Sequence, residues 1–185
     1  ILLKALRQDS INCQIKKLAL KEHSGAVIDK LTLHFEAGRH GGRLTDFNLV
    51  MPNSHLTADS IVATFEAHGN KIKSGTLRFH GAIGKSQIGI SDLAFLQPAF
   101  DGADRDIVLE SRFHGTDGEF TLDHLHAAFN ADVIAKALAM NDSTVARIGN
   151  IAIETKGRID TLGSGNIDIR LNTDAGNLKL LASAD

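Results

Sequence analysis

The chain of 185 residues contains no Trp, no Tyr, only two Pro and a single Cys. The missing Trp and Tyr remove the side chains that most often stack against sugars. Cys13 is the only cysteine, so an intramolecular disulfide is excluded and the redox compartment stays open. No apolar run approaches the roughly 20 residues of a membrane-spanning helix.

Charge of either sign is not in excess. The 20 basic and 22 acidic residues give a formal net charge of -2, so no global field attracts nucleic acid, and we expect no nucleic-acid partner. Hydrophobic residues make up 43% and charged residues 23% of the chain, which is typical of a folded globular protein. The length corresponds to about one domain, and we treat residues 1–185 as a single unit.

Apolar and polar residues alternate with a period of two along most of the chain, which predicts strands with one face in water. The clearest example has Leu31, Leu33, Phe35 and Ala37 on one side and Thr32, His34 and Glu36 on the other. Turn-forming residues separate such stretches, and Asp117-Gly118 and Gly69-Asn70 suit tight hairpins. The pattern predicts an all-β fold: an elongated antiparallel meander of about ten or more short strands.

Two segments interrupt this pattern and allow one or two short helices. Residues 91–100 could form a helix with Ser91 or Asp92 as N-cap, ended by Pro98. Residues 131–140 form an Ala-rich apolar run that periodicity alone assigns neither to helix nor to strand.

An antiparallel sheet with one apolar face must cover that face with a second sheet, by closing into a barrel, or with something other than protein. Small residues such as Ala63 and Ala127 are interspersed among Leu, Ile, Val and Phe, which is compatible with a sheet curled into an open groove, a β-taco. A self-filled β-sandwich or solenoid with no cargo stays an alternative, because composition does not distinguish the two.

Several segments resemble AsmA-like proteins of the TamB group. Residues 15–35 resemble a hairpin of these proteins, and residues 44–56 resemble the strand pair that follows it. The segments 90–100, 115–125, 157–162, 167–171 and 176–178 are similar to further units of the same family. The stretch 131–148 matches no such hairpin.

The resemblance implies a function in the cell envelope of a diderm bacterium. Such proteins are anchored in the inner membrane, cross the periplasm as a bent sheet with an apolar lining, and are implicated in phospholipid transport and outer-membrane biogenesis, including protein secretion. We therefore expect this chain to be an interior, periplasmic segment of a larger protein, with phospholipid as its partner. The full-length protein would also have an outer-membrane barrel as a partner.

The predicted function is a hydrophobic groove that carries or shields phospholipid acyl chains between the inner and outer membranes. The residues that we expect to line it are the apolar members of the alternating stretches: Leu33, Phe35, Phe47, Leu49, Ile61, Phe65, Leu77, Phe79, Ile107, Leu109, Ile151, Ile153, Ile167, Ile169 and Leu171. An alternative is a scaffold whose strand edges pair with unfolded outer-membrane proteins by β-augmentation.

An enzyme is the third class of function, and we predict no catalytic residue, no metal and no cofactor. The sequence contains no nucleophile elbow, dinucleotide-binding turn, phosphate-binding loop or zinc-protease helix motif. His124 and His126 are spaced to share one strand face, as two metal ligands would. Histidines on a solvated face are the simpler interpretation.

Overall fold

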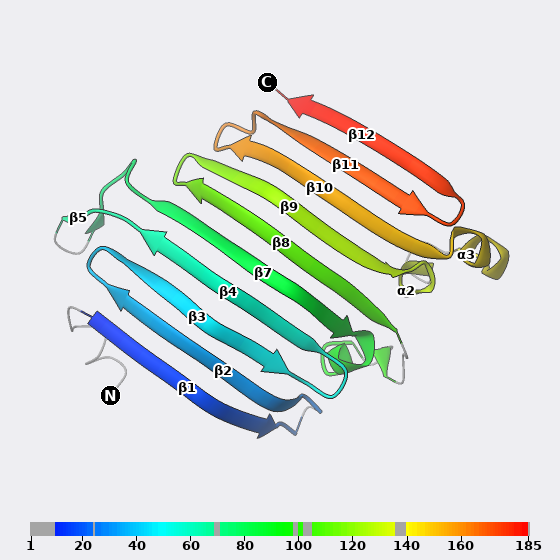
Figure 1. Cartoon of the computed structure of the whole chain (residues 1–185), viewed down its shortest axis with the longest axis horizontal. Helices are drawn as coiled ribbons and strands as arrows, with labels where there is room; N and C mark the ends of the chain where they lie inside the picture. Colours follow the sequence, from blue (N-terminus) through cyan, green and yellow to red (C-terminus); the bar gives the residue numbers. More distant parts are fainter. Residues whose placement is uncertain are drawn as a thin grey trace.

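A computed structural model describes residues 10–23, 25–68, 71–97, 100–101, 105–135 and 140–184. Ten antiparallel strands form one sheet in which every strand pairs with its neighbours along the chain (Figure 1). The predicted all-β meander is confirmed. Its first and last strands lie at opposite ends of the strand order, so the sheet is open and does not close into a barrel.

The strands of the main sheet are β1 (Ser10–Lys21), β2 (Val27–Gly38), β3 (Gly41–Val50), β4 (His55–Thr64), β7 (Arg78–Gly89), β8 (Asp106–Thr116), β9 (Glu119–Asn130), β10 (Asn150–Asp160), β11 (Gly165–Thr173) and β12 (Gly176–Ala184). They contain 9 to 12 residues each, and the prediction of short strands is wrong. A bulge shifts the apolar alternation by one residue, which in the sequence resembles the end of a strand.

Bulges in five strands adjoin one row of residues that crosses the sheet. The row includes Leu33 of β2, Phe47 of β3 and Ala58 of β4. Next to this row, the pairing between strands is offset by an extra residue in β1, β3, β4, β7 and β9. In β3 the bulge contains Asp46, whose φ of 55° is left-handed. Because a bulge bends its strand and increases the twist, aligned bulges curl the sheet about a line across the strands.

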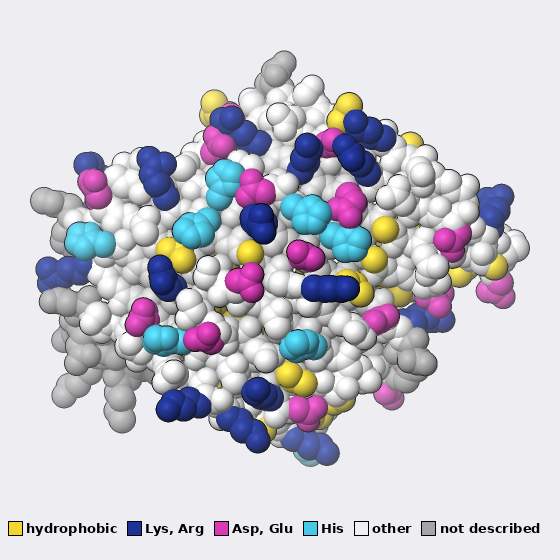
Figure 2. Space-filling view, in the orientation of Figure 1, with side chains coloured by type: hydrophobic (Ala, Val, Ile, Leu, Met, Phe, Trp, Pro, Cys, Tyr) yellow, Lys and Arg dark blue, Asp and Glu magenta, His cyan; other side chains and the backbone are white. Residues whose placement is uncertain are grey.

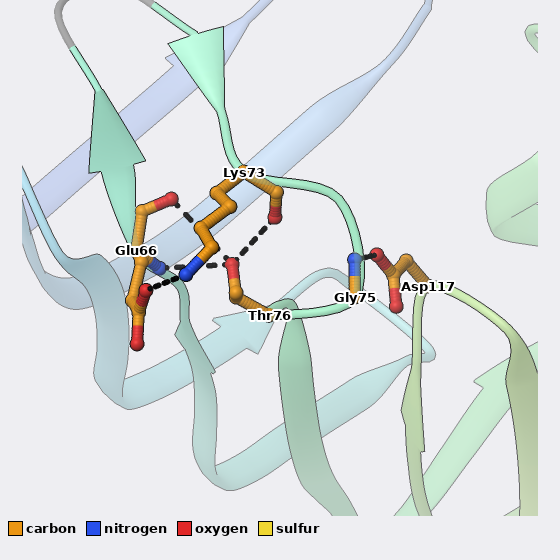
Figure 3. Close-up of polar contacts among 5 residues, drawn as sticks. All are labelled: Glu66, Lys73, Gly75, Thr76 and Asp117. Carbon is orange, nitrogen blue, oxygen red and sulfur yellow. Dashed lines mark hydrogen bonds and ion pairs between the residues drawn. The ribbon is translucent and has the colours of Figure 1, made fainter.

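A small hairpin between β4 and β7 consists of β5 (Ala67–His68) and β6 (Lys71–Ile72). Lys73 Nζ lies 2.8 Å from Glu66 Oε2 beside it, and the Gly75 N–H donates to the carboxylate of Asp117 in the β8–β9 turn (Figure 3). Asp117-Gly118 joins β8 to β9, which confirms the predicted hairpin. The predicted Gly69-Asn70 turn lies outside the described residues.

Among the described residues of the segment 91–100, the predicted helix is replaced by a 3-10 turn, η1 (Ile90–Leu93), and the turns that follow it. Neither Ser91 nor Asp92 caps this turn, because the N-cap position is occupied by Gly89, which has no side chain to accept a hydrogen bond. The Asp92 carboxylate instead accepts hydrogen bonds from the backbone N–H and the side-chain amide of Asn53, at 2.9 and 3.1 Å. Pro98 lies outside the described residues.

The ambiguous segment 131–140 contains one helical turn among its described residues. It contains α2 (Asp132–Ala135), residues 136–139 lie outside the description, and α3 (Asp142–Ile148) follows. The Asn141 side chain caps α3 by accepting a hydrogen bond from the Thr144 N–H at 2.8 Å. In the described part of the chain, none of the helices is long and apolar enough to cross a bilayer.

The sheet is a single layer with little interior. Among the described residues, the buried apolar residues are Ala58, Ile90, Ala131 and Ile151. The accessible surface of the chain is 12575 Å², whereas a compact monomer of 19.8 kDa exposes about 8,600 Å². The sandwich alternative requires a second sheet of similar size, but the described residues contain only the two-stranded β5–β6 sheet besides the main one.

Candidate functional site: the apolar face of the sheet

The apolar side chains of the strands form rows across one face of the sheet, because antiparallel pairing places them opposite one another. One row runs from β2 to β11 and consists of Phe35, Leu44, Ile61, Gly81, Phe113, Leu122, Gly157 and Ile167. A second row includes Leu109, Ala127, Ile153, Leu171 and Leu178. We call this curled face the apolar groove.

Most of the predicted lining residues lie on this face. The pairing register places there Leu33, Phe35, Phe47, Leu49, Ile61, Phe79, Ile107, Leu109, Ile151, Ile153, Ile167, Ile169 and Leu171. The other two lie just outside the strands: Phe65 follows β4, where its N–H donates to His40 O at 2.9 Å, and Leu77 precedes β7. Both side chains are half-buried.

The groove contains further apolar residues that the sequence analysis did not select as lining. They include Ile83, Phe113, Phe120, Leu122, Leu125, Phe129, Ile159, Leu178 and Leu180. The bulge in β9 separates Leu122 from Leu125 by three residues while both face the groove. Period-two alternation misses one of such a pair, and a search that allows one inserted residue would have found both.

Three phenylalanines form a cluster in the groove across strands β7, β8 and β9. The ring centroids of Phe79 and Phe120 are 6.2 Å apart, and those of Phe113 and Phe120 are 6.1 Å apart. The Phe79 ring lies close over Gly115, since a Cβ there would come within 2.6 Å of Phe79 Cζ. The rings therefore lie along the sheet over glycines, which keeps the apolar layer thin.

An apolar hollow of about 350 Å³ opens beside this cluster, between β9 and β12. Its lining includes Phe120, Leu122, Ile159, Ile167 and Ala182. Ile159 is 51% exposed and Ile167 is 38% exposed. Apolar side chains in this part of the groove thus lie open to the surroundings.

The opposite face of the sheet is polar, and Figure 2 shows charged and histidine side chains spread over it. Several pair across strands: His114 Nδ1 lies 2.9 Å from Asp123 Oδ2, and Arg158 Nη2 lies 2.5 Å from Glu119 Oε2. Charges on one face and aliphatic side chains on the other make the sheet amphipathic.

His124 and His126 lie on the polar face, as their spacing predicted. The Nδ1 atom of His126 is 2.5 Å from Glu154 Oε1, and that of His124 is 3.5 Å from Glu154 Oε2. Both histidines therefore face one carboxylate of the neighbouring strand. Within the residues that the structure covers, no three His, Cys, Asp or Glu side chains are grouped so that they could hold a metal ion.

Comparisons of the chain with protein-family models, with curated proteins and with solved structures found no match. The resemblance to AsmA-like proteins therefore stays a prediction.

Proposed function

We propose that the apolar groove binds the acyl chains of phospholipids while the polar face of the sheet remains in water. The observation that carries this proposal is a single-layer sheet whose apolar face has no second layer of protein among the described residues. Exposed apolar patches of this extent in folded proteins mark surfaces that bind a partner or a lipid.

The hydrophobic effect provides the free energy for such binding. Each buried methylene contributes about 0.8 kcal/mol, so a 16-carbon chain laid along the apolar rows would gain roughly ten kcal/mol before the cost of ordering it. The rows provide apolar contact and no fixed array of polar groups, so the interaction selects a hydrocarbon chain rather than a particular polar ligand. An open groove also lets the headgroup stay hydrated.

Continuity of the apolar rows supports transport as well as storage. The row through Phe35 and Ile167 continues from β2 to β11 without a charged residue. Neighbouring strands are about 4.8 Å apart, so these eight strands extend the row over roughly 34 Å. The resemblance to AsmA-like proteins supports the same proposal, and with it we propose a periplasmic location between the inner and outer membranes.

The experiment that tests this proposal compares two carboxylates on adjacent residues with opposite orientation. Ile167→Asp introduces a charge in the groove, whereas Asn166→Asp introduces the same side chain on the polar face. Each chain is purified, incubated with phospholipid vesicles that contain a fluorescent phospholipid, re-isolated, and analysed for bound lipid by mass spectrometry.

We expect the unmodified chain and Asn166→Asp to retain lipid and Ile167→Asp to lose most of it while remaining folded by circular dichroism. A half-exposed groove wall can hydrate a carboxylate, whereas a closed core would unfold at a cost of several kcal/mol. A folded, unmodified chain that retains no phospholipid above background would overturn the proposal. Equal lipid retention by both variants would also overturn it.

A further inference from the structure

The row of residues beside the bulges contains two hydroxyl side chains on the apolar face. Pairing across β8, β9 and β10 places Ser111 opposite Leu125, and Leu125 opposite Thr155. From Ser111 towards β2 the row continues through Ile83, Ala58, Phe47 and Leu33.

The two hydroxyls differ in their hydrogen bonds. Thr155 Oγ1 donates to the backbone oxygen of Asp168 at 3.2 Å. Ser111 is 7% exposed, and its hydroxyl makes no hydrogen bond with any residue that the structure describes. Its oxygen keeps some accessible surface, because the fully covered side-chain oxygens without a partner in the described chain belong to Asp132 and Asp168. Ser111 therefore presents an unused hydrogen-bond donor to the groove.

The surroundings of this hydroxyl restrict the polar atom that can reach it. The neighbouring residues on the groove face are Ile83, Leu109, Phe113 and Leu125, and their side chains have no hydrogen-bonding group. A charged phosphate placed there would lose its water without gaining a counter-charge, which is costly. A neutral carbonyl oxygen next to a hydrocarbon chain needs only one hydrogen bond to compensate its burial. The ester group of an acyl lipid has such an oxygen.

We propose that the Ser111 hydroxyl donates a hydrogen bond to an ester carbonyl oxygen of a bound phospholipid, so that the groove prefers ester-linked to ether-linked lipids. This inference rests on the proposed function and adds to it a fixed position of the lipid on the sheet. Strand β8 lies inside the strand order (Figure 1), and Ser111 is the middle residue of Asp106–Thr116. The ester group is therefore held away from both ends of the strand.

The same row indicates in which direction an acyl chain extends from Ser111. The hydrocarbon core of a bilayer is about 30 Å thick and contains two layers of acyl chains, so one chain spans roughly 15 Å. Towards β2 the row stays apolar over four strand spacings, about 19 Å. Towards β12 it reaches the hydroxyl of Thr155 after two strand spacings. We therefore expect an acyl chain to run from β8 towards β3 and β2.

Two matched phospholipids test the hydrogen bond. Phosphatidylcholines with the same hydrocarbon chains, one ester-linked and one ether-linked, compete with the fluorescent phospholipid for the purified protein. We expect the ester-linked lipid to bind roughly three- to tenfold more tightly, which is the contribution of one neutral hydrogen bond. Ser111→Ala should abolish this preference by weakening only the ester-linked lipid, whereas Ser111→Thr retains a hydroxyl and should keep it. Ser60→Ala makes the same change on the polar face and should alter neither affinity.

The outcomes separate this inference from the proposed function. Equal affinity of the unmodified protein for the two lipids would overturn the inference, as would an ester preference that persists in folded Ser111→Ala. Lipid is still bound in both cases, so the proposed function is unaffected. A protein that binds neither lipid would overturn the proposed function and this inference together.

A photoreactive group on the last carbon of an acyl chain tests the direction. After irradiation of the bound ester-linked lipid, mass spectrometry of the proteolysed protein locates the label. We expect label in β2 and β3, residues 27–50, and not in β11 and β12, residues 165–184. Label confined to β11 and β12, or divided equally between the two sides, would contradict the proposed direction.

Discussion

The ring of Phe113 on β8 lies over Gly81 on β7. A Cβ on residue 81 would come within 2.7 Å of Phe113 Cζ and within 3.1 Å of Ile61 Cγ1. Glycine at this position lets a large ring lie along the sheet instead of standing away from it. The depth of the groove therefore depends on a residue with no side chain.

Replacing Gly81 by valine should lift the Phe113 ring into the groove. We expect Gly81→Val to lower the free energy of unfolding by about 1–3 kcal/mol, since overpacked side chains cost this much, and to reduce phospholipid binding. Thermal unfolding and the fluorescent phospholipid assay measure the two effects.

Gly118→Ala is the control for this variant, because an added Cβ there meets only Thr116 Oγ1 at 3.8 Å. It should change neither stability nor lipid binding measurably. Unchanged lipid binding by a folded Gly81→Val chain would show that the ring does not limit the groove.

The contact between Lys73 and Glu66 predicts opposite pKa shifts. The hydrogen bond from Lys73, and then its charge, lower the pKa of Glu66 below the usual carboxyl range, and the same contact raises the pKa of Lys73. NMR titration of the Glu66 side chain should show this lowered pKa, and Lys73→Met should raise it toward its usual value. Lys71→Met, a nearby change on β6, should leave it unaltered.

The pH dependence of stability follows from these directions. The contribution of Glu66 is complete above the usual carboxyl pKa and is lost as the pH falls through its lowered pKa in the folded chain. The contribution of Lys73 is complete below the usual lysine pKa and is lost as the pH rises through its raised pKa. Both side chains are well exposed, so water screens the contact and the effect on unfolding should be small. A Glu66 pKa that does not respond to Lys73→Met would contradict the contact.

The Asp92 carboxylate should stabilise the β3–β4 turn rather than act as the N-cap of a helix. Asp92→Ala removes both hydrogen bonds from Asn53, and we expect a loss of about 1.5–3 kcal/mol in the free energy of unfolding, because a hydrogen bond to a charged group contributes this much. Urea denaturation measures the loss. Asp101→Ala, at an exposed position nearby, should have little effect. An equally stable Asp92→Ala chain would be the contrary result.

The strands and their two faces were predictable from local pattern. The alternation around Leu33 assigned the apolar face of β2 correctly, and Asp117-Gly118 predicted its hairpin. The role of Asp92 was not predictable. Its local sequence is that of a helix N-cap, and this local pattern is the same whether or not a distant Asn binds the carboxylate. Asn53 lies 39 residues away, and only folding brings the two together.

Alternation and turn chemistry by themselves determined that this chain forms an antiparallel meander with one apolar face, because side chains on a strand alternate with a fixed period. The tertiary structure decided the rest. The bulges in different strands align only when the strands pair, and their alignment curls the sheet.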